Sequence, residues 1–239
     1  MSDTDYVIVG GSSGIGLEIV QRLADRGDRV LVVSRSVENG SASQLPGVRH
    51  LNADVTQSEI DRSQLPESIG GMVYCPGSIR LRPFHRLTPD DFLSDWKINF
   101  LGAVQSIQAC LPALKKSDFP ASIVLFSTVA VGTGMPFHAS IASAKGAVEG
   151  LVRSLAAELA PRIRVNAIAP SLTDTRLAHS LLADDGKRKA AAQRHPLKRT
   201  GLPADSAAAA IFLMDGAASW ITGQVLAVDG GMGSVRTFK

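Results

Sequence analysis

A glycine-rich segment near the amino end has the residue types of a phosphate-binding loop. It runs from Gly10 to Gly16 and includes Ser12, Ser13, Gly14 and Ile15. In a strand-to-helix turn of this kind, backbone N–H groups point outward and the amino end of the helix adds partial positive charge. Glycines let a pyrophosphate approach the backbone closely. The segment therefore predicts a pyrophosphate site, and the alternative is a glycine-rich turn that binds nothing.

The elements around this loop alternate between apolar runs and segments with helical spacing. The expected strands are residues 6–9, 29–33, 48–51, 71–75, 122–126, 164–168 and 224–228, and the expected helices are residues 17–26, 91–111, 140–159 and 203–214. Strands without alternation that are separated by amphipathic helices indicate a parallel sheet covered on both faces. The prediction is an α/β fold over residues 1–239, with no linker that would divide it into two domains.

Composition narrows the class of protein. The chain has 239 residues, of which 45% are hydrophobic and 20% charged, and its net charge is +3. This composition excludes a disordered chain, and so small a charge excess gives weak support for nucleic-acid binding. Two cysteines, Cys75 and Cys110, exclude a disulfide scaffold, and we expect both to be buried thiols and no metal site. The apolar runs are too short for a membrane span and the polar amino end does not resemble a signal peptide, so we expect a cytoplasmic protein.

Several motifs together resemble those of the short-chain dehydrogenase/reductase family, over nearly the whole chain. They are Gly10, Gly14 and Gly16 in the loop, Asp54 and Val55 after the third strand, Asn99 in a helix, Lys145 in Ala-Lys-Gly, and residues 221–231 near the end. The resemblance implies a doubly wound Rossmann-type sheet and a nicotinamide cofactor. It also implies cofactor contacts from Gly10, Ser12, Ser13, Gly14, Ile15, Gly16, Ser34, Arg35, Asp54, Val55, Gly77, Lys145, Pro170, Thr173 and Thr175.

The end of the second strand predicts which nicotinamide cofactor binds. An acidic residue there accepts the ribose 2′-hydroxyl of NAD, whereas a basic residue accommodates the 2′-phosphate of NADP. Here Ser34 and Arg35 follow the strand and no carboxylate does. One charge-assisted hydrogen bond contributes about 1.5–3 kcal/mol, which is roughly a 10- to 150-fold preference. We therefore predict NADP(H) rather than NAD(H); the alternative is that Arg35 is a solvated loop residue.

The family's Ser, Tyr, Lys and Asn arrangement is incomplete in this sequence. Asn99 and Lys145 match, and Thr128, preceded by Ser127, stands where the family has Ser. The Tyr position, four residues before Lys145, is occupied by Ile141. Since isoleucine has no proton to donate, the resemblance implies a catalytic group of Asn99, Thr128 and Lys145 with another proton donor. A positioned general acid supplies about 10²–10⁴-fold, so hydride transfer remains compatible with this loss.

Four residues are candidates to replace the missing phenol. His138 is near one helical turn before Ile141 and has a suitable unperturbed pKa, although an exposed loop histidine is the alternative. Ser140 adjoins Ile141, but its expected role is the helix N-cap. Lys145 could have a pKa lowered by burial, or could bind ribose only. Tyr74, at the end of a strand, could be a donor or could pack in the core.

Other positions also depart from the family's pattern. Val9 precedes the glycine loop where threonine is usual, residues 74–77 read Tyr-Cys-Pro-Gly in place of Asn-Asn-Ala-Gly, and Ser171 follows Pro170 where the family has glycine.

Two basic segments follow the fourth and sixth strands, where ligands bind in such sheets. They contain Arg80, Arg82, His85 and Arg86, and then Arg176, Lys187, Arg188, Lys189, Arg194, His195, Lys198 and Arg199. They suggest a small anionic substrate, with a solvated helix face as the alternative.

Three functions stay open: an atypical oxidoreductase acting on a carbonyl/alcohol pair, a degenerate NADP(H)-binding sensor or interaction module, and a non-redox lyase or isomerase. The family resemblance also implies a homodimer or homotetramer.

Overall fold

Seven parallel strands form one sheet in the computed structural model, which describes residues 4–35, 42 and 44–237. Their order is β3-β2-β1-β4-β5-β6-β7. The strands are β1 (Asp5–Val9), β2 (Arg29–Ser34), β3 (Val48–Asn52), β4 (Gly71–Tyr74), β5 (Ala121–Phe126), β6 (Ile163–Pro170) and β7 (Val225–Val228). The order reverses between β1 and β4, and such a switch point opens a crevice at the carboxyl ends of the strands. The predicted doubly wound α/β fold is confirmed.

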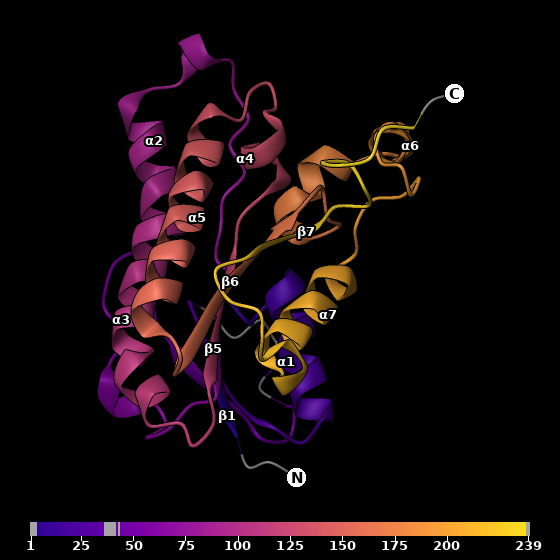
Figure 1. Cartoon of the computed structure of the whole chain (residues 1–239). Helices are drawn as coiled ribbons and strands as arrows, with labels where there is room; N and C mark the ends of the chain where they lie inside the picture. Colours follow the sequence, from indigo (N-terminus) through magenta and orange to yellow (C-terminus); the bar gives the residue numbers. More distant parts are fainter. Residues whose placement is uncertain (1–3, 36–41, 43, 238–239) are drawn as a thin grey trace.

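Helices cover both faces of this sheet. They are α1 (Gly14–Asp25), α2 (Pro89–Trp96), α3 (Gly102–Lys115), α4 (Val129–Thr133), α5 (Ala139–Leu159), α6 (Asp185–Gln193) and α7 (Pro203–Met214), with short 3₁₀ turns at Arg62–Gln64, Phe84–Arg86, Arg176–Leu182 and Gly216–Ala218. Figure 1 shows α3 and α5 together on one face, and α1 beside α7 on the other. None of the helices in the described ranges combines the length and apolarity needed to cross a membrane.

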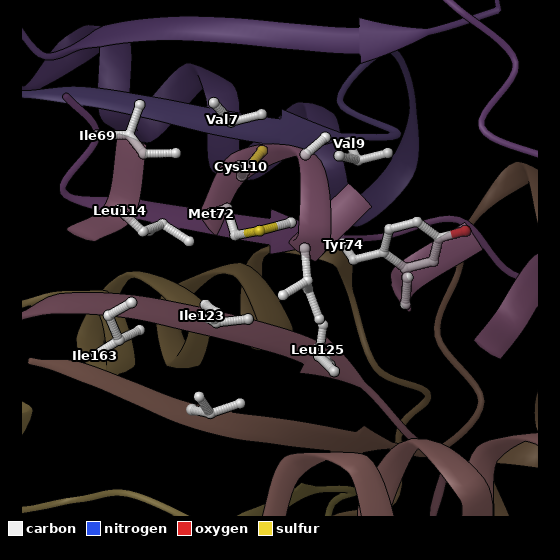
Figure 2. Close-up of a cluster of buried hydrophobic side chains, with 14 of the residues drawn as sticks. Val7, Val9, Ile69, Met72, Tyr74, Cys110, Leu114, Ile123, Leu125 and Ile163 are labelled. Atoms are coloured by element: carbon white, nitrogen blue, oxygen red, sulfur yellow. The ribbon is translucent and has the colours of Figure 1, made fainter. Parts of the chain in front are cut away.

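Each face of the sheet has its own hydrophobic core. Buried side chains of α3 and α5 pack on one face against β1, β4 and β5, and this cluster is drawn in Figure 2. It includes Met72, Ile123, Leu125 and Cys110. The predicted burial is confirmed for Cys110, but the prediction was wrong for Cys75, which is only half-buried because it lies at the wall of a cavity after β4. On the other face, α1 and α7 pack against the alternate residues of the same strands. Because both faces are covered, the strands are apolar throughout rather than alternating.

The long helix expected over residues 91–111 is interrupted, so the prediction of one continuous helix was wrong. A π-helical turn, Lys97–Leu101, separates α2 from α3. The cause is Tyr74, whose hydroxyl donates a hydrogen bond of 2.6 Å to the carbonyl of Ile98. Insertion of a side chain into the helical ladder is a known cause of such bulges. Gly102 makes room for the phenol, since a Cβ there would lie 2.3 Å from its oxygen.

The first turn of α5 also differs from the expectation. The helix begins at Ala139, with His138 at the N-cap position, so the prediction that Ser140 caps it was wrong. Ser140 is buried inside the first turn, and its hydroxyl donates a hydrogen bond of 2.6 Å to the carboxylate of Asp95 in α2. The Ser140 side chain therefore links α5 to α2 and does not cap α5.

Candidate active site

A cavity of about 800 Å³ opens at the carboxyl ends of β1, β2 and β4. It has the size of a ligand site. Its lining includes twelve of the predicted cofactor residues: Gly10, Ser12, Ser13, Gly14, Ile15, Gly16, Ser34, Arg35, Asp54, Val55, Gly77 and Thr175. Among the described residues, its lining does not include Asn99, Thr128, His138, Lys145, Pro170 or Thr173. The glycine loop, the end of β2 and the loop after β4 therefore meet around one space.

The glycine loop has the close backbone packing that a pyrophosphate cradle requires. A Cβ at Gly16 would lie 2.3 Å from the carbonyl oxygen of Gly10, so only glycine fits there. Gly14 has φ +56°, a conformation that other residues rarely adopt. The loop leads directly into α1, whose first N–H groups have no partner within the helix. These features fit the diphosphate of a dinucleotide.

The end of β2 forms the part of the cavity that would receive the adenosine ribose. Arg35 lines the cavity together with Ser34 and Asp54. Thr56 donates hydrogen bonds of 2.9 and 2.7 Å to Asp54 through its backbone N–H and its hydroxyl, and these bonds lower the pKa of that carboxyl. Arg35 contributes to the same lowering by its charge. Asp54 is therefore an ionised acceptor, and Arg35 is a cation near it.

Asn99 and Lys145 approach the inner end of this cavity from two different helices. A Cβ at Gly77, which lines the cavity, would lie 3.2 Å from Asn99 Oδ1 and 3.7 Å from Lys145 Nζ. Asn99 donates through Nδ2 to the Ser78 hydroxyl and to the Asp95 carbonyl, both at 2.8 Å. Its Oδ1 is buried and has no hydrogen-bond partner among the described residues. The two predicted residues therefore come together, and an unpaired acceptor lies beside the lysine.

Lys145 has the properties of an acid–base group. Its side chain is 7% exposed, and Nζ donates a hydrogen bond of 2.7 Å to the carbonyl of Phe126 at the end of β5. Burial lowers the pKa of Lys145 to about 8. The nearby thiol of Cys75 is not an alternative nucleophile, because burial raises its pKa to about 12. Lys145 therefore titrates close to neutral pH.

Two of the predicted catalytic residues are held by local structure. Thr128 is the N-cap of α4, where its hydroxyl oxygen accepts a hydrogen bond of 3.3 Å from the N–H of Ala130. The preceding Ser127 is buried and donates to Glu149 at 2.7 Å, so Thr128 is the more accessible hydroxyl of the two. The ring of His138 is 2.8 Å, through Nδ1, from the carbonyl of Pro136 in the loop before α5.

Ile141 and Tyr74 differ in what they offer at the site. Ile141 is 5% exposed and lies one turn before Lys145 on α5. Tyr74 is buried under the helices, and burial raises the pKa of its phenol far above the usual range. In Figure 2 its hydroxyl points away from the apolar cluster, and it donates to the Ile98 carbonyl. Tyr74 therefore packs in the core and supports the π turn, rather than donating a proton to a substrate.

Several of the basic side chains predicted near the substrate are ion-paired. Arg80 and Arg82 both pair with Asp91, Arg188 pairs with Asp174 at 2.6 Å, and Arg199 pairs with Asp205 at 2.6 Å. His195 is buried, so it does not belong to a basic surface. Arg176 and Leu177 line the main cavity, and the sequence analysis had named Arg176 but not Leu177.

Several lining residues were not predicted to bind the cofactor. They are Val9, Val33, Ala53, Thr56, Cys75, Pro76 and Ile98. Each adjoins a predicted site residue, and the strand ends bring them to the cavity. Within residues 4–35, 42 and 44–237, no cluster of three or more His, Cys, Asp or Glu side chains could hold a metal ion.

The strand order and the glycine cradle define a Rossmann-type α/β protein. A family model described as "Enoyl-(Acyl carrier protein) reductase" matches residues 9–233. The chain belongs to the short-chain dehydrogenase/reductase family of oxidoreductases.

Comparisons with individual proteins agree with this assignment. The chain is 34% identical over 237 residues to "Carbonyl reductase family member 4" of Danio rerio, covering 95% of this chain and 96% of the relative. It is 33% identical over 234 residues to the 3-oxoacyl-[acyl-carrier-protein] reductase MabA of Mycobacterium tuberculosis, covering 95% and 92%. Among solved structures, the ligand-free aldohexose dehydrogenase of Thermoplasma acidophilum has a TM-score of 0.85 and 27% identity, covering 99% and 98%.

Proposed function

We propose that this protein is an NADP(H)-dependent oxidoreductase that acts on a carbonyl/alcohol pair. The observation that carries the proposal is the cavity lined by the glycine cradle and Arg35, with Asn99 and Lys145 next to Gly77 of its wall. The nicotinamide cofactor would supply or accept the hydride. Relatives named as a carbonyl reductase family member and a 3-oxoacyl-[acyl-carrier-protein] reductase support a carbonyl substrate.

In this proposal each cofactor group meets a particular part of the chain. The loop from Gly10 to Gly16 holds the pyrophosphate through backbone N–H groups and the amino end of α1. Arg35 binds the ribose 2′-phosphate, and Asp54 with Val55 faces the adenine. The residues expected around the nicotinamide half are Gly77, Pro170, Thr173 and Thr175, of which Gly77 and Thr175 line the main cavity.

Lys145 is the proton donor that the geometry favours. Its pKa of about 8 keeps the ammonium available near neutral pH, where proton transfer is most efficient. Thr128 would orient the substrate carbonyl, and Asn99 Oδ1 offers an acceptor near the Lys145 ammonium. His138 is the second choice, because Lys145 Nζ lies next to Gly77 of the main cavity, whereas the His138 ring contacts the Pro136 carbonyl. The proton that the missing phenol would have donated thus comes from Lys145.

A degenerate NADP(H)-binding sensor is the second candidate, and the apolar Ile141 side chain favours it. An Ile141→Tyr variant separates the two functions when it is tested for NADPH oxidation with a panel of ketones and 3-oxoacyl thioesters. Activity that appears only in the variant would mean that the parent is degenerate. Activity present in the parent and reduced in the variant would mean that the apolar residue belongs to a working site. Ile141→Phe is the matched control, since it adds an aromatic ring without a hydroxyl.

An Arg35→Ala variant tests the cofactor preference. We expect its affinity for NADPH to fall roughly 10- to 150-fold, the value of one charge-assisted hydrogen bond, with little change for NADH. Arg49→Ala is the control, because it removes the same charge from an exposed position on β3. An equal loss for both cofactors, or no loss, would contradict the role of Arg35.

Partners and location complete the proposal. The substrate is a small molecule, and Arg176 at the cavity is the residue most able to favour an anionic one. Nucleic acid and membrane are not proposed as partners. We further propose a cytoplasmic homodimer or homotetramer.

A further inference from the structure

A second cavity, of about 610 Å³, shares no lining residue with the main cavity. It lies where the ends of β6 and β7 meet the start of α7. Its lining includes Ser171, the residue that stands where the family has glycine, and His195. Thr173, predicted to bind the cofactor, lines this second cavity.

Ser171 and His195 form a hydrogen-bonded pair whose proton positions can be derived. Ser171 Oγ lies 2.9 Å from His195 Nε2, and His195 Nδ1 lies 2.8 Å from the carbonyl oxygen of Ala191. A carbonyl can only accept a hydrogen bond, so Nδ1 carries the ring proton. In the neutral imidazole Nε2 is then an acceptor, and the Ser171 hydroxyl donates to it. The serine therefore has a base in position and the base has a third group that orients it, as an activated nucleophile requires.

The imidazole is held in place by its surroundings. His195 is 2% exposed and lies two residues after the end of α6, while Gly230 of the loop after β7 packs against it. A Cβ at Gly230 would lie 3.6 Å from Cβ and Cδ2 of His195. Ser171 Oγ also lies 3.1 Å from Met232 Sδ, which is a weak acceptor that competes little with the imidazole. Ser171 itself is half-buried at the cavity wall, so a ligand in the cavity can reach its oxygen.

The rest of the cavity suits a small acyl group. Its apolar wall comes from Leu172, Leu197, Ala208, Ala227 and Val228. The first residues of the 12-residue helix α7, including Ala204 and Asp205, lie on the same cavity. The Asp205 carboxylate in this first turn accepts a hydrogen bond from the Leu202 N–H and pairs with Arg199, which also lines the cavity. The helix end therefore adds no oxyanion site to the Ser171–His195 pair.

We propose that Ser171 and His195 form an esterase-type site that takes small esters with short apolar acyl groups. Ser171 Oγ attacks the ester carbonyl carbon, and its proton passes to His195 Nε2. The imidazolium returns that proton to the leaving alkoxide as the carbon–oxygen bond breaks, which leaves an acylated serine and an alcohol. Water then loses a proton to His195 and attacks the acyl group, and the products are a carboxylic acid and the free serine. The step consumes only ester and water, so it is independent of nicotinamide chemistry.

Active-site labelling tests this site directly on the full chain. The probe is an alkyl fluorophosphonate, and peptide mass spectrometry locates the adduct; p-nitrophenyl acetate hydrolysis is followed in parallel. We expect one adduct on Ser171, lost in Ser171→Ala, while Ser219→Ala, an exposed serine, keeps the parent rate. His195→Asn should slow labelling roughly 10²–10⁴-fold, the contribution of a positioned general base.

Two further measurements distinguish a variant that has lost its nucleophile from a variant that has failed to fold. Thermal melts followed by circular dichroism show whether each variant is folded, and Ser171→Cys keeps a nucleophile next to the imidazole. Ser171→Cys should therefore be alkylated by iodoacetamide at residue 171 faster than the parent's other cysteines. Absence of an adduct on Ser171 in the folded parent would overturn the proposal, as would a labelling rate that is unchanged in a folded His195→Asn variant. NADPH titration of the same samples reports on the cofactor site separately.

Discussion

Removing the Tyr74 hydroxyl and adding a Cβ at Gly102 should have non-additive effects on the free energy of unfolding, because the two groups would occupy the same space. Replacing Tyr74 by Phe removes the 2.6 Å hydrogen bond to the Ile98 carbonyl. A buried group that loses its partner costs about 1–3 kcal/mol. At this chain length the midpoint of thermal unfolding should fall by roughly 2–12 °C.

Gly102→Ala tests the same contact from the helix. Its new Cβ would lie 2.3 Å from the Tyr74 oxygen and 3.3 Å from Cζ, an overpacking that costs about 1–3 kcal/mol. In a Tyr74→Phe background the 2.3 Å contact is absent, so the same substitution should cost much less. Alanine also has the higher helix propensity, by about 0.5–1 kcal/mol.

A double-mutant cycle measures this coupling. Urea unfolding of the parent, the two single variants and the double variant gives four free energies of unfolding. The double variant should be more stable than the sum of the single effects predicts, by at least about 1 kcal/mol. Gly150→Ala is the control, because a Cβ at that helical position meets open space. Additive effects, within about 0.5 kcal/mol, would refute the explanation of the π turn.

Three further predictions follow from the site. Because the Lys145 ammonium is the proton donor and its pKa is about 8, carbonyl reduction by saturating NADPH should be constant below pH 8 and fall above it; a rate that rises through pH 8 would contradict this role. Gly16→Ala should abolish most NADPH binding, because its Cβ would lie 2.3 Å from the Gly10 carbonyl oxygen, whereas Gly132→Ala, in open space, should bind normally by fluorescence titration. Sedimentation equilibrium should give the mass of a dimer or tetramer, and a monomeric mass would contradict the proposed assembly.

The strands of the sheet and the glycine loop of the main cavity could be predicted, because each is specified by a short stretch of sequence. Continuous apolar runs between amphipathic helices indicate parallel strands, and the glycine spacing from Gly10 to Gly16 indicates the loop between β1 and α1. The sequence also identified Asn99 and Lys145, and the fold brings both to Gly77.

Features that depend on contacts between distant residues were missed. The π turn arises from Tyr74, which is 24 residues from its partner Ile98. The role of Ser140 depends on Asp95, 45 residues away, so a capping rule based on neighbours failed. His195 was grouped with basic neighbours in sequence, yet it is buried against Ser171, and the cavity they share is lined by residues far apart in the sequence, from Arg22 to Gly231.

The central claim is that the cavity at the end of β1 binds NADP(H). The most direct test is a titration of the purified protein with NADPH and with NADH, followed by nicotinamide fluorescence. We expect binding of both, with NADPH preferred by about tenfold or more, the lower bound for one charge-assisted hydrogen bond from Arg35. A preference for NADH would contradict the assignment of Arg35, and absence of binding by either would contradict both the oxidoreductase and the sensor.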